Sequence, residues 1–85
     1  MSVPWSILWS KTARKDLNSL DPPTLKRIIE GIDAFALNGV GDVKKLQGSN
    51  EFRLRVGDWR VVFVLSHESD TILIKQVAHR REAYR

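Results

Sequence analysis

The chain has 85 residues, enough for one domain over residues 1–85 with a modest core, but too few to surround a deep pocket, so a site should be a shallow surface groove. It contains no cysteine, which excludes disulfides and thiolate chemistry, and it has neither a leader-peptide pattern nor an apolar run of membrane-spanning length, so we expect a cytoplasmic protein. Lys and Arg number 14 against 10 Asp and Glu, a net charge of +4 that is concentrated in the C-terminal half and suits a polyanionic partner.

The N-terminal segment predicts a β-strand. Within residues 3–9, Trp5, Ile7 and Trp9 alternate with small or exposed positions, as in a strand with one buried face. Pro4 near its start favours an edge strand or the beginning of a strand, because proline cannot donate to a central ladder.

Two helices should follow as an antiparallel hairpin. Ser10 is a suitable N-cap for a short amphipathic helix over residues 11–20. Asp21, followed by proline, marks the start of a second helix, which Gly39 ends. Gly31 inside this helix costs up to about 1 kcal/mol relative to alanine, which indicates close packing there against a strand or the first helix.

The rest of the chain predicts a loop and then a sheet. Residues 38–51 have loop composition, whereas residues 52–56 and 59–65 alternate as strands around a Gly57-Asp58 turn of type I′ or II′. Residues 71–80 form a further strand. The fold class is therefore α+β: an N-terminal strand, the helical hairpin, and a three-stranded antiparallel meander that completes one twisted sheet.

The two-residue turn fixes the register of the hairpin and gathers its arginines. Arg55 faces Arg60 across the ladder and Arg53 lies on the same face, while the other face is apolar. Directly opposed like charges destabilise a strand pair, so either acids neutralise this cluster or an anion binds to it. The alternative is a solvated sheet face, which explains most charged strand positions in small domains. The full register pairs Val56 with Trp59, Arg55 with Arg60, Leu54 with Val61, Arg53 with Val62 and Phe52 with Phe63.

Strand parity limits which terminal residues can join this basic face. Gln76, Ala78 and Arg80 share one side, and Lys75, Val77, His79 and Arg81 share the other. Either Arg80 or the pair of His79 and Arg81 can therefore face the same substrate as the hairpin arginines while the strand stays regular. Tyr84 could pin the tail to the core edge or stack on a nucleobase.

Several other chemistries are excluded by spacing. His67 and His79 lack the spacing of a metal site, the acids are scattered, and no glycine-rich phosphate loop precedes a helix. A Ser-His-Asp framework is also missing. We therefore expect no metal and no cofactor, and a substrate that brings its own nucleophile.

The segments "VKKLQG", "FRLRVGDWRVVF" and "VAHRREAY" resemble the RelE/ParE superfamily of toxins from prokaryotic toxin–antitoxin systems, over nearly the whole chain. The likeness is greater to the RelE branch. It implies a microbial-ribonuclease-like fold and a metal-independent messenger-RNA interferase acting in the ribosomal A site, by attack of the RNA 2′-hydroxyl on the adjacent phosphate to give a 2′,3′-cyclic phosphate. It also implies a cognate antitoxin that covers the basic groove within a toxin–antitoxin hetero-oligomer.

The resemblance also implies roles for single residues. Arg60 matches the arginine that contacts the scissile phosphate, Arg80 the terminal arginine that stabilises charge or protonates the leaving group, and Tyr84 the tyrosine that stacks on a base. The catalytic candidates are Arg53, Arg55, Arg60, His79, Arg80 and Tyr84, and the RNA-binding candidates are Lys44, Lys45, Lys75 and Arg81.

The sequence departs from the family pattern at the general base. Some members carry two lysines where this chain has Arg53 and Arg55, and a guanidinium is permanently charged and cannot accept a proton. His79 is the substitute, since imidazole exchanges protons readily near neutral pH. The family's C-terminal helix is also nearly absent here.

Two other functions fit the same resemblance. The chain could be a ParE-like inhibitor of DNA gyrase, which binds without catalysis, or an inactive relative that binds only its antitoxin. The terminal "HRREAY" favours the ribonuclease, because a pure binder has no evident need for those side chains beside an arginine-rich face.

Overall fold

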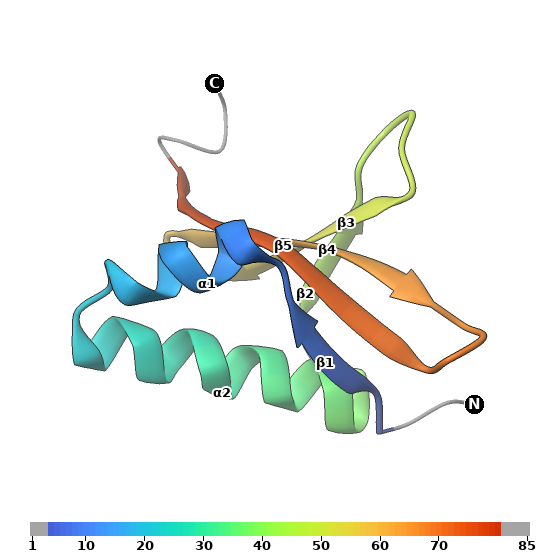
Figure 1. The fold of residues 1–85 in the computed structure, drawn as a ribbon, viewed down its shortest axis with the longest axis horizontal. Helices are drawn as coiled ribbons and strands as arrows, with labels where there is room; N and C mark the ends of the chain where they lie inside the picture. Colours follow the sequence, from blue (N-terminus) through green and yellow to red (C-terminus); the bar gives the residue numbers. More distant parts are fainter. Residues whose placement is uncertain (1–3, 81–85) are drawn as a thin grey trace.

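The computed structural model describes residues 4–80, which form two helices and five strands. The elements are β1 (Ser6–Trp9), α1 (Lys11–Asn18), α2 (Pro22–Asn38), β2 (Asp42–Lys45), β3 (Glu51–Val56), β4 (Trp59–Ser66) and β5 (Thr71–His79). The strands make a single sheet in the order β1-β5-β4-β3-β2, and both helices cross it on the same side (Figure 1). The predicted α+β class is confirmed.

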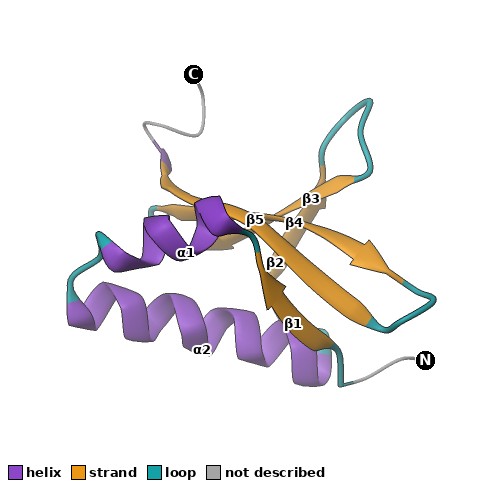
Figure 2. Cartoon of the chain, viewed as in Figure 1, coloured by secondary structure: helices purple, strands orange, loops and turns teal. Residues whose placement is uncertain are grey.

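The sheet is antiparallel except at β1, which runs parallel to β5. β1 is an edge strand, as Pro4 indicated. The twist of the sheet is plain in Figure 2, where β3 crosses the direction of β5.

The other edge corrects the sequence prediction. Residues 42–45, expected within a loop, form β2 and pair with Arg55 through Phe52 of β3. The error has a physical cause: of the side chains in this short edge strand only Val43 is partly buried, and the flanking glycines give the segment the composition of a loop.

The helices begin where their capping residues predict, and α2 ends at the predicted Gly39, whereas α1 ends at Asn18 and not at the predicted residue 20. The Ser10 hydroxyl accepts a hydrogen bond from the Ala13 amide at 3.0 Å, and the Asp21 carboxylate accepts one from the Thr24 amide. Hydrogen bonding from Thr24, chiefly from its side chain, lowers the pKa of Asp21. Gly39 ends α2 with φ of 71°, a left-handed conformation that favours glycine. Within residues 4–80, neither helix has both the length and the apolar character that a membrane span requires.

One apolar core joins the helices to the inner face of the sheet. Phe63 of β4 lies at its centre, 1% exposed, with ring centroids 5.3 Å from Phe35 of α2 and 5.6 Å from Phe52 of β3. Alternation along each strand places these side chains inward and puts the hairpin arginines on the opposite face, which also carries apolar residues such as Val62 and Leu73. The core is made of Ala13, Ile28, Ile32, Ala36, Leu54, Val61, Phe63, Ile72, Ile74 and Val77.

Gly31 marks the closest approach of α2 to the sheet. A Cβ atom at this position would lie 2.8 Å from Val56 Cγ2 of β3, which confirms the predicted close packing against a strand. We expect Gly31→Val to lower the free energy of unfolding by about 1–3 kcal/mol, because Val56 or the helix must move. Urea denaturation checks this, with Asp33→Val on the exposed side of α2 as the control. A Gly31→Val protein as stable as the wild type would contradict the packing argument, because valine is a better helix former than glycine and only crowding can make it worse here.

The β3–β4 hairpin has the predicted register in full, from Val56 opposite Trp59 to Phe52 opposite Phe63. Gly57 has φ of 60° while Asp58 keeps a negative φ, which is the pattern of a type II′ turn. The arginines of the hairpin therefore share the face of the sheet that the helices leave uncovered.

Candidate functional site

The sheet surface opposite the helices, called here the open face, carries the arginines. In β3, Arg53 and Arg55 alternate with inward residues such as Leu54, and in β4 Arg60 precedes the buried Val61. Arg55 and Arg60 are directly opposed in the ladder, at a spacing of about 5 Å between backbones. The predicted grouping of the hairpin arginines is thus confirmed.

Arg80 follows β5 directly and completes the group. Arg60 is opposite Ala78, and a backbone bond from Arg80 to Asp58 continues this pairing one residue beyond His79, which places Arg80 diagonally beside Arg60. The Arg80 amide donates to the Asp58 carbonyl oxygen at 2.7 Å, which ties it to the hairpin turn. Arg53, Arg55, Arg60 and Arg80 are called here the arginine cluster.

Burial differs strongly within the arginine cluster. Arg60 is only 5% exposed although it belongs to the open face, and its guanidinium contacts the Trp59 carbonyl oxygen at 3.4 Å. Arg53 is partly buried, and its Nε has no hydrogen-bond acceptor among residues 4–80. A buried donor left without an acceptor is costly, so an oxyanion at this surface would stabilise Arg53 directly.

Within residues 4–80, the acids near Arg55 and Arg80 compensate these two side chains only weakly. Asp42 faces Arg55 across the β2–β3 ladder, but the two side chains form no ion pair. Asp58 lies 4.0 Å from the Arg80 guanidinium, and both side chains are well exposed, so their attraction is weak. Glu51 is engaged by Lys75 at 2.5 Å.

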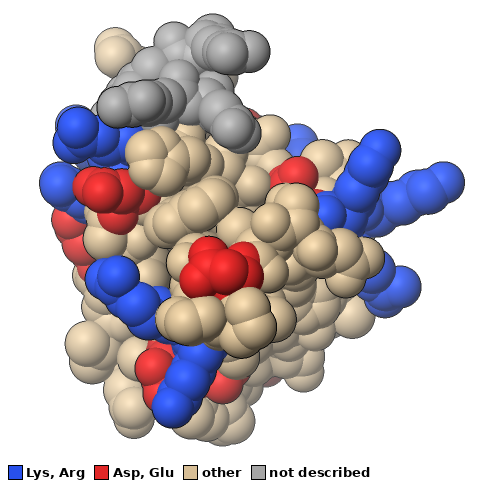
Figure 3. All heavy atoms as spheres, turned by 90° about the vertical axis from the view of Figure 1, so that its left-hand side faces the viewer, with Lys and Arg blue, Asp and Glu red and all other residues tan. Residues whose placement is uncertain are grey.

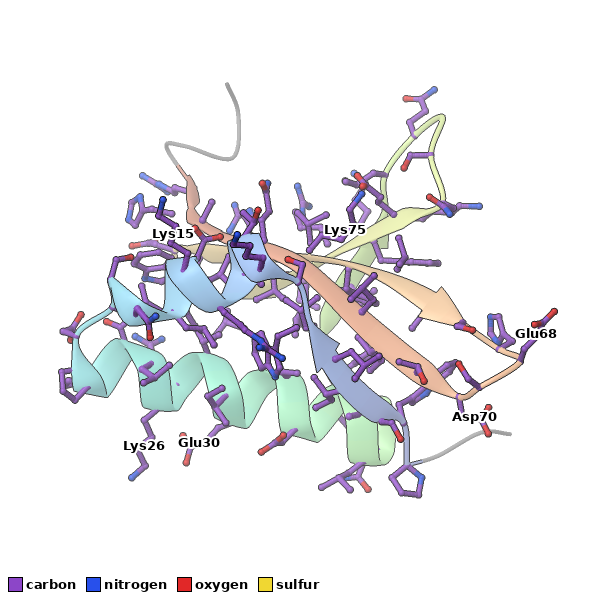
Figure 4. All side chains as sticks on the ribbon, in the orientation of Figure 1. Lys15, Lys26, Glu30, Glu68, Asp70 and Lys75 are labelled. Carbon is purple, nitrogen blue, oxygen red and sulfur yellow. The ribbon has the colours of Figure 1, made fainter. Side chains whose placement is uncertain are left out.

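The lysine candidates are separated by the sheet. Lys44 is opposite Arg53 and extends the basic open face, whereas Lys45 is opposite Phe52 and therefore belongs to the other face. Lys75 corrects a prediction: it was expected on the side of Val77, yet it projects away from α2 toward Glu51, as Figure 4 shows for its side chain. In the same view Lys26 and Glu30 project from α2 away from the sheet.

The cause of this correction is a β-bulge in β5. Val62 pairs with Gln76 but Phe63 pairs with Ile74, so Lys75 is an extra residue in the ladder. In a regular strand Lys75 would lie on the side of Val77. Parity from Gln76 onward is as predicted, and only Lys75 changes side.

His79 does not join the arginine cluster. It is opposite Trp59, on the side of the sheet that also carries Val77, and its ring meets the indole edge to face with centroids 5.3 Å apart at 89°. The structure thus places Arg80 with the hairpin arginines and His79 behind them. Arg81 and Tyr84 lie outside the described residues.

The positive charge is not spread evenly over the molecule. On the side that holds the α1–α2 connection, acidic and basic side chains are interspersed (Figure 3). On the open face, by contrast, cations occupy neighbouring positions of four strands, from Lys44 on β2 to the end of β5. Residues 4–80 enclose no pocket, so the candidate site is an open surface.

The opposition of Arg55 and Arg60 has a measurable consequence. We expect Arg55→Gln to raise the free energy of unfolding by about 0.2–1 kcal/mol at low salt, because it removes a like-charge cross-strand pair. High salt should reduce this gain by screening. Urea denaturation in low and high salt checks it, with the exposed Arg14→Gln in α1 as the control. A loss of stability in the Arg55 variant would show that a neighbouring acid dominates its environment.

Chemically, the arginine cluster can bind and polarise a phosphodiester. Guanidinium groups offer paired donors that match phosphate oxygens, and they remain charged at every physiological pH. Two partners were missed by the sequence analysis, Glu51 for Lys75 and Asp58 for Arg80. The position of Asp58 in a tight turn does not predict its contact with Arg80, because that contact depends on how the chain leaves β5.

Comparison with known families gives one family model over nearly the whole chain. Residues 7–84 match the family described as the ParE toxin of the type II toxin–antitoxin system parDE. The match includes every element from β1 to β5 and the whole arginine cluster.

Individual relatives carry RelE-type names. The chain is 35% identical over 80 residues to the "Putative toxin RelE1" of Methanocaldococcus jannaschii, which covers 88% of this chain and 89% of that protein. It is 29% identical over 90 residues to "Toxin RelG" of Mycobacterium tuberculosis, covering 98% and 99%.

A solved structure supports the same fold. The chain is similar, with a TM-score of 0.74 and 34% identity, to a chain of the RelB-RelE antitoxin–toxin complex from Methanococcus jannaschii, and the match covers 91% of this chain and 94% of that one. The predicted fold of the RelE type is therefore confirmed.

Proposed function

We propose a function from one premise: the chain belongs to the ParE toxin family of type II toxin–antitoxin systems, within the RelE/ParE superfamily. It is the toxin of a RelBE-type system, and its activity is the metal-independent cleavage of messenger RNA on the ribosome. The arginine cluster on the open face is the observation that carries this proposal, because a stretch of RNA presents the phosphates that such a cluster binds.

The proposed reaction is an internal transesterification. The 2′-hydroxyl oxygen attacks the adjacent phosphorus, the bond from phosphorus to the 5′-oxygen breaks, and the products are a 2′,3′-cyclic phosphate and a free 5′-hydroxyl. One proton leaves the 2′-oxygen and one reaches the 5′-oxygen. Extra negative charge develops on the non-bridging oxygens in the transition state, and the protein must stabilise it.

The residues of the arginine cluster have different parts in this reaction. Arg60, buried at the centre, binds the scissile phosphate in a fixed orientation. Arg80, exposed at the end of β5, stabilises the charge that develops toward the leaving group. Arg53 and Arg55 hold the neighbouring phosphates, and Lys44 extends this track on β2.

Proton acceptance is the one role that the arginine cluster cannot perform, since guanidinium groups have no free lone pair for it. His79 is the proposed acceptor. Its ring lies against Trp59 on the side of β5 opposite the arginine cluster, so this role requires the end of β5 to twist and bring the imidazole to the rim of the site. Arg81 and Tyr84 are also proposed to contact RNA.

The proposed regulator is a cognate antitoxin. The related Methanococcus jannaschii structure is a RelB-RelE antitoxin–toxin complex, which supports a protein partner of this kind. An acidic segment of the antitoxin would neutralise the arginine cluster and exclude RNA from the open face.

Induction of the protein in a translating extract tests the function. We expect cleavage within codons of ribosome-bound messages, with new 5′-hydroxyl ends, and no cleavage of the same RNA without ribosomes. Primer extension maps the ends. Intact messages under these conditions would overturn the proposal.

A second function has its own support, since the family model takes its description from ParE. In that case the protein inhibits DNA gyrase by binding alone. Accumulated gyrase cleavage complexes together with intact messages would identify this activity, and the same extract can be assayed for both.

A further inference from the structure

The second half of β5, which leads to the arginine cluster, has no strand paired with it on the edge where β1 lies. β1 pairs with β5 only as far as Trp9 opposite Ile74. Beyond that point the polar atoms on this edge of β5 are met by α1 instead. The Ser10 amide donates to the Ile74 carbonyl oxygen at 2.9 Å, the Ser10 hydroxyl donates to the Lys75 carbonyl oxygen at 2.7 Å, and the Val77 amide donates to Asp16 Oδ2 at 2.9 Å.

These contacts hold the backbone of β5 at the bulged residue, Lys75, and shortly after it. The Ser10 hydroxyl holds the carbonyl of Lys75, and Asp16 holds the amide of Val77, two residues further along. The side chains of Ser10, the N-cap of α1, and of Asp16 thereby fix the backbone of β5 where its ladder with β4 is interrupted. At such a bulge a strand is least restrained by its own hydrogen bonds.

The bulge decides which terminal side chain faces the substrate. Before it, Ile74 points into the core; after it, Val77 does, so the inward parity changes from even to odd positions. In a regular strand continuing from Ile74, His79 would face the open side and Arg80 would face the helices. With the bulge, Arg80 joins the arginine cluster and His79 packs on Trp59.

We infer that Ser10 and Asp16 are positioning residues for the proposed reaction, which clamp the β5 bulge so that Arg80 faces the RNA. This inference rests on the proposed function. Asp16 is the sharper probe, because Ser10 also caps α1 through the Ala13 amide. Asp16 lies in the last turn of α1, where the helix dipole disfavours a carboxylate, so helix stability alone does not explain an acid there.

The first arm of the test measures single-turnover cleavage on ribosomes. We expect Asp16→Ala to lower the rate constant between about 10- and 100-fold, with a smaller change in the concentration needed for half-saturation, because Arg80 is displaced from its place beside the phosphate. Asp16→Asn should restore most of the rate, since its amide oxygen can still accept from Val77. Asp33→Ala, an exposed aspartate of α2, is the matched control.

The decisive comparison uses a background in which Arg80 is already impaired. If Asp16 acts through Arg80, Asp16→Ala should cost much less in an Arg80→Lys protein than in the wild type. An undiminished loss in that background, or a wild-type rate for Asp16→Ala, would overturn the inference.

The second arm does not need activity. Hydrogen exchange of the Val77 amide should accelerate in Asp16→Ala, and the amide shifts of Ala78 and Arg80 should change, while exchange of the Val61 amide in β4 stays as in the wild type. Unchanged β5 amides would overturn the clamp even if the protein proved inactive on RNA. Failure of the wild type to cleave messages, with the β5 amides changed as expected, would instead overturn only the proposed function.

Discussion

Replacing Arg80 with alanine should reduce ribosome-dependent cleavage by about 10²–10³-fold, the usual effect of removing one preorganised group that stabilises transition-state charge. Arg80 directly follows β5, and it lies diagonally beside Arg60 through the pairing of Arg60 with Ala78. Lys75 on β5 does not take this place, since it is bound to Glu51. The loss should fall on the rate constant, because Arg53, Arg55 and Arg60 still bind the RNA backbone.

The stability of the Arg80→Ala protein should be nearly unchanged. The Arg80 side chain is 56% exposed, and its ion pair with Asp58 is long at 4.0 Å, so its removal should cost less than about 1 kcal/mol. The backbone bond from the Arg80 amide to the Asp58 carbonyl oxygen survives the substitution. Single-turnover cleavage and thermal denaturation check both statements, with Arg14→Ala on α1 as the charge-matched control. Equal losses of cleavage in the two variants would show a general effect of charge and not a catalytic role.

The sequence predicts those parts of this molecule that depend on local signals. The Gly57-Asp58 turn sets the hairpin register, and the register in turn sets Arg55 against Arg60. Ser10, Asp21 and Gly39 mark the helix ends because each meets a backbone need at one position. These features need no knowledge of the tertiary fold.

The features that the sequence does not predict depend on distant partners. β2 is a strand only because the edge of β3 is available to it, and its one partly buried side chain, Val43, gives no alternating pattern. The bulge at Lys75 lies where β1 ends and α1 contacts the edge of β5. This contact joins Asp16 to Val77, 61 positions apart in the sequence. The side of the sheet occupied by Lys75 follows from that bulge, which is why the predicted parity is wrong for Lys75 and correct from Gln76 to His79.

Arg60 is expected to be the residue whose replacement is least tolerated in cleavage. It occupies the middle of the open face, opposite both Arg55 and Ala78, and at 5% exposure its guanidinium is held in place by its surroundings. A fixed guanidinium acts on a phosphate without first being ordered, so it can stabilise the transition state at little entropic cost. We expect Arg60→Met to lower the single-turnover rate constant by about 10³-fold.

Two substitutions at Arg60 separate charge from geometry. Methionine keeps the volume of the arginine stem, so the free energy of unfolding should change by less than about 1.5 kcal/mol, as urea denaturation will show. Arg60→Lys keeps the charge but replaces the planar fork by a single ammonium group, and its cleavage rate should fall between those of the wild type and the methionine variant. A lysine variant as slow as the methionine variant would show that bidentate geometry supplies the whole effect. A methionine variant that cleaves at the wild-type rate would remove the arginine cluster from the proposed active site, because among residues 4–80 Arg60 is the one buried arginine.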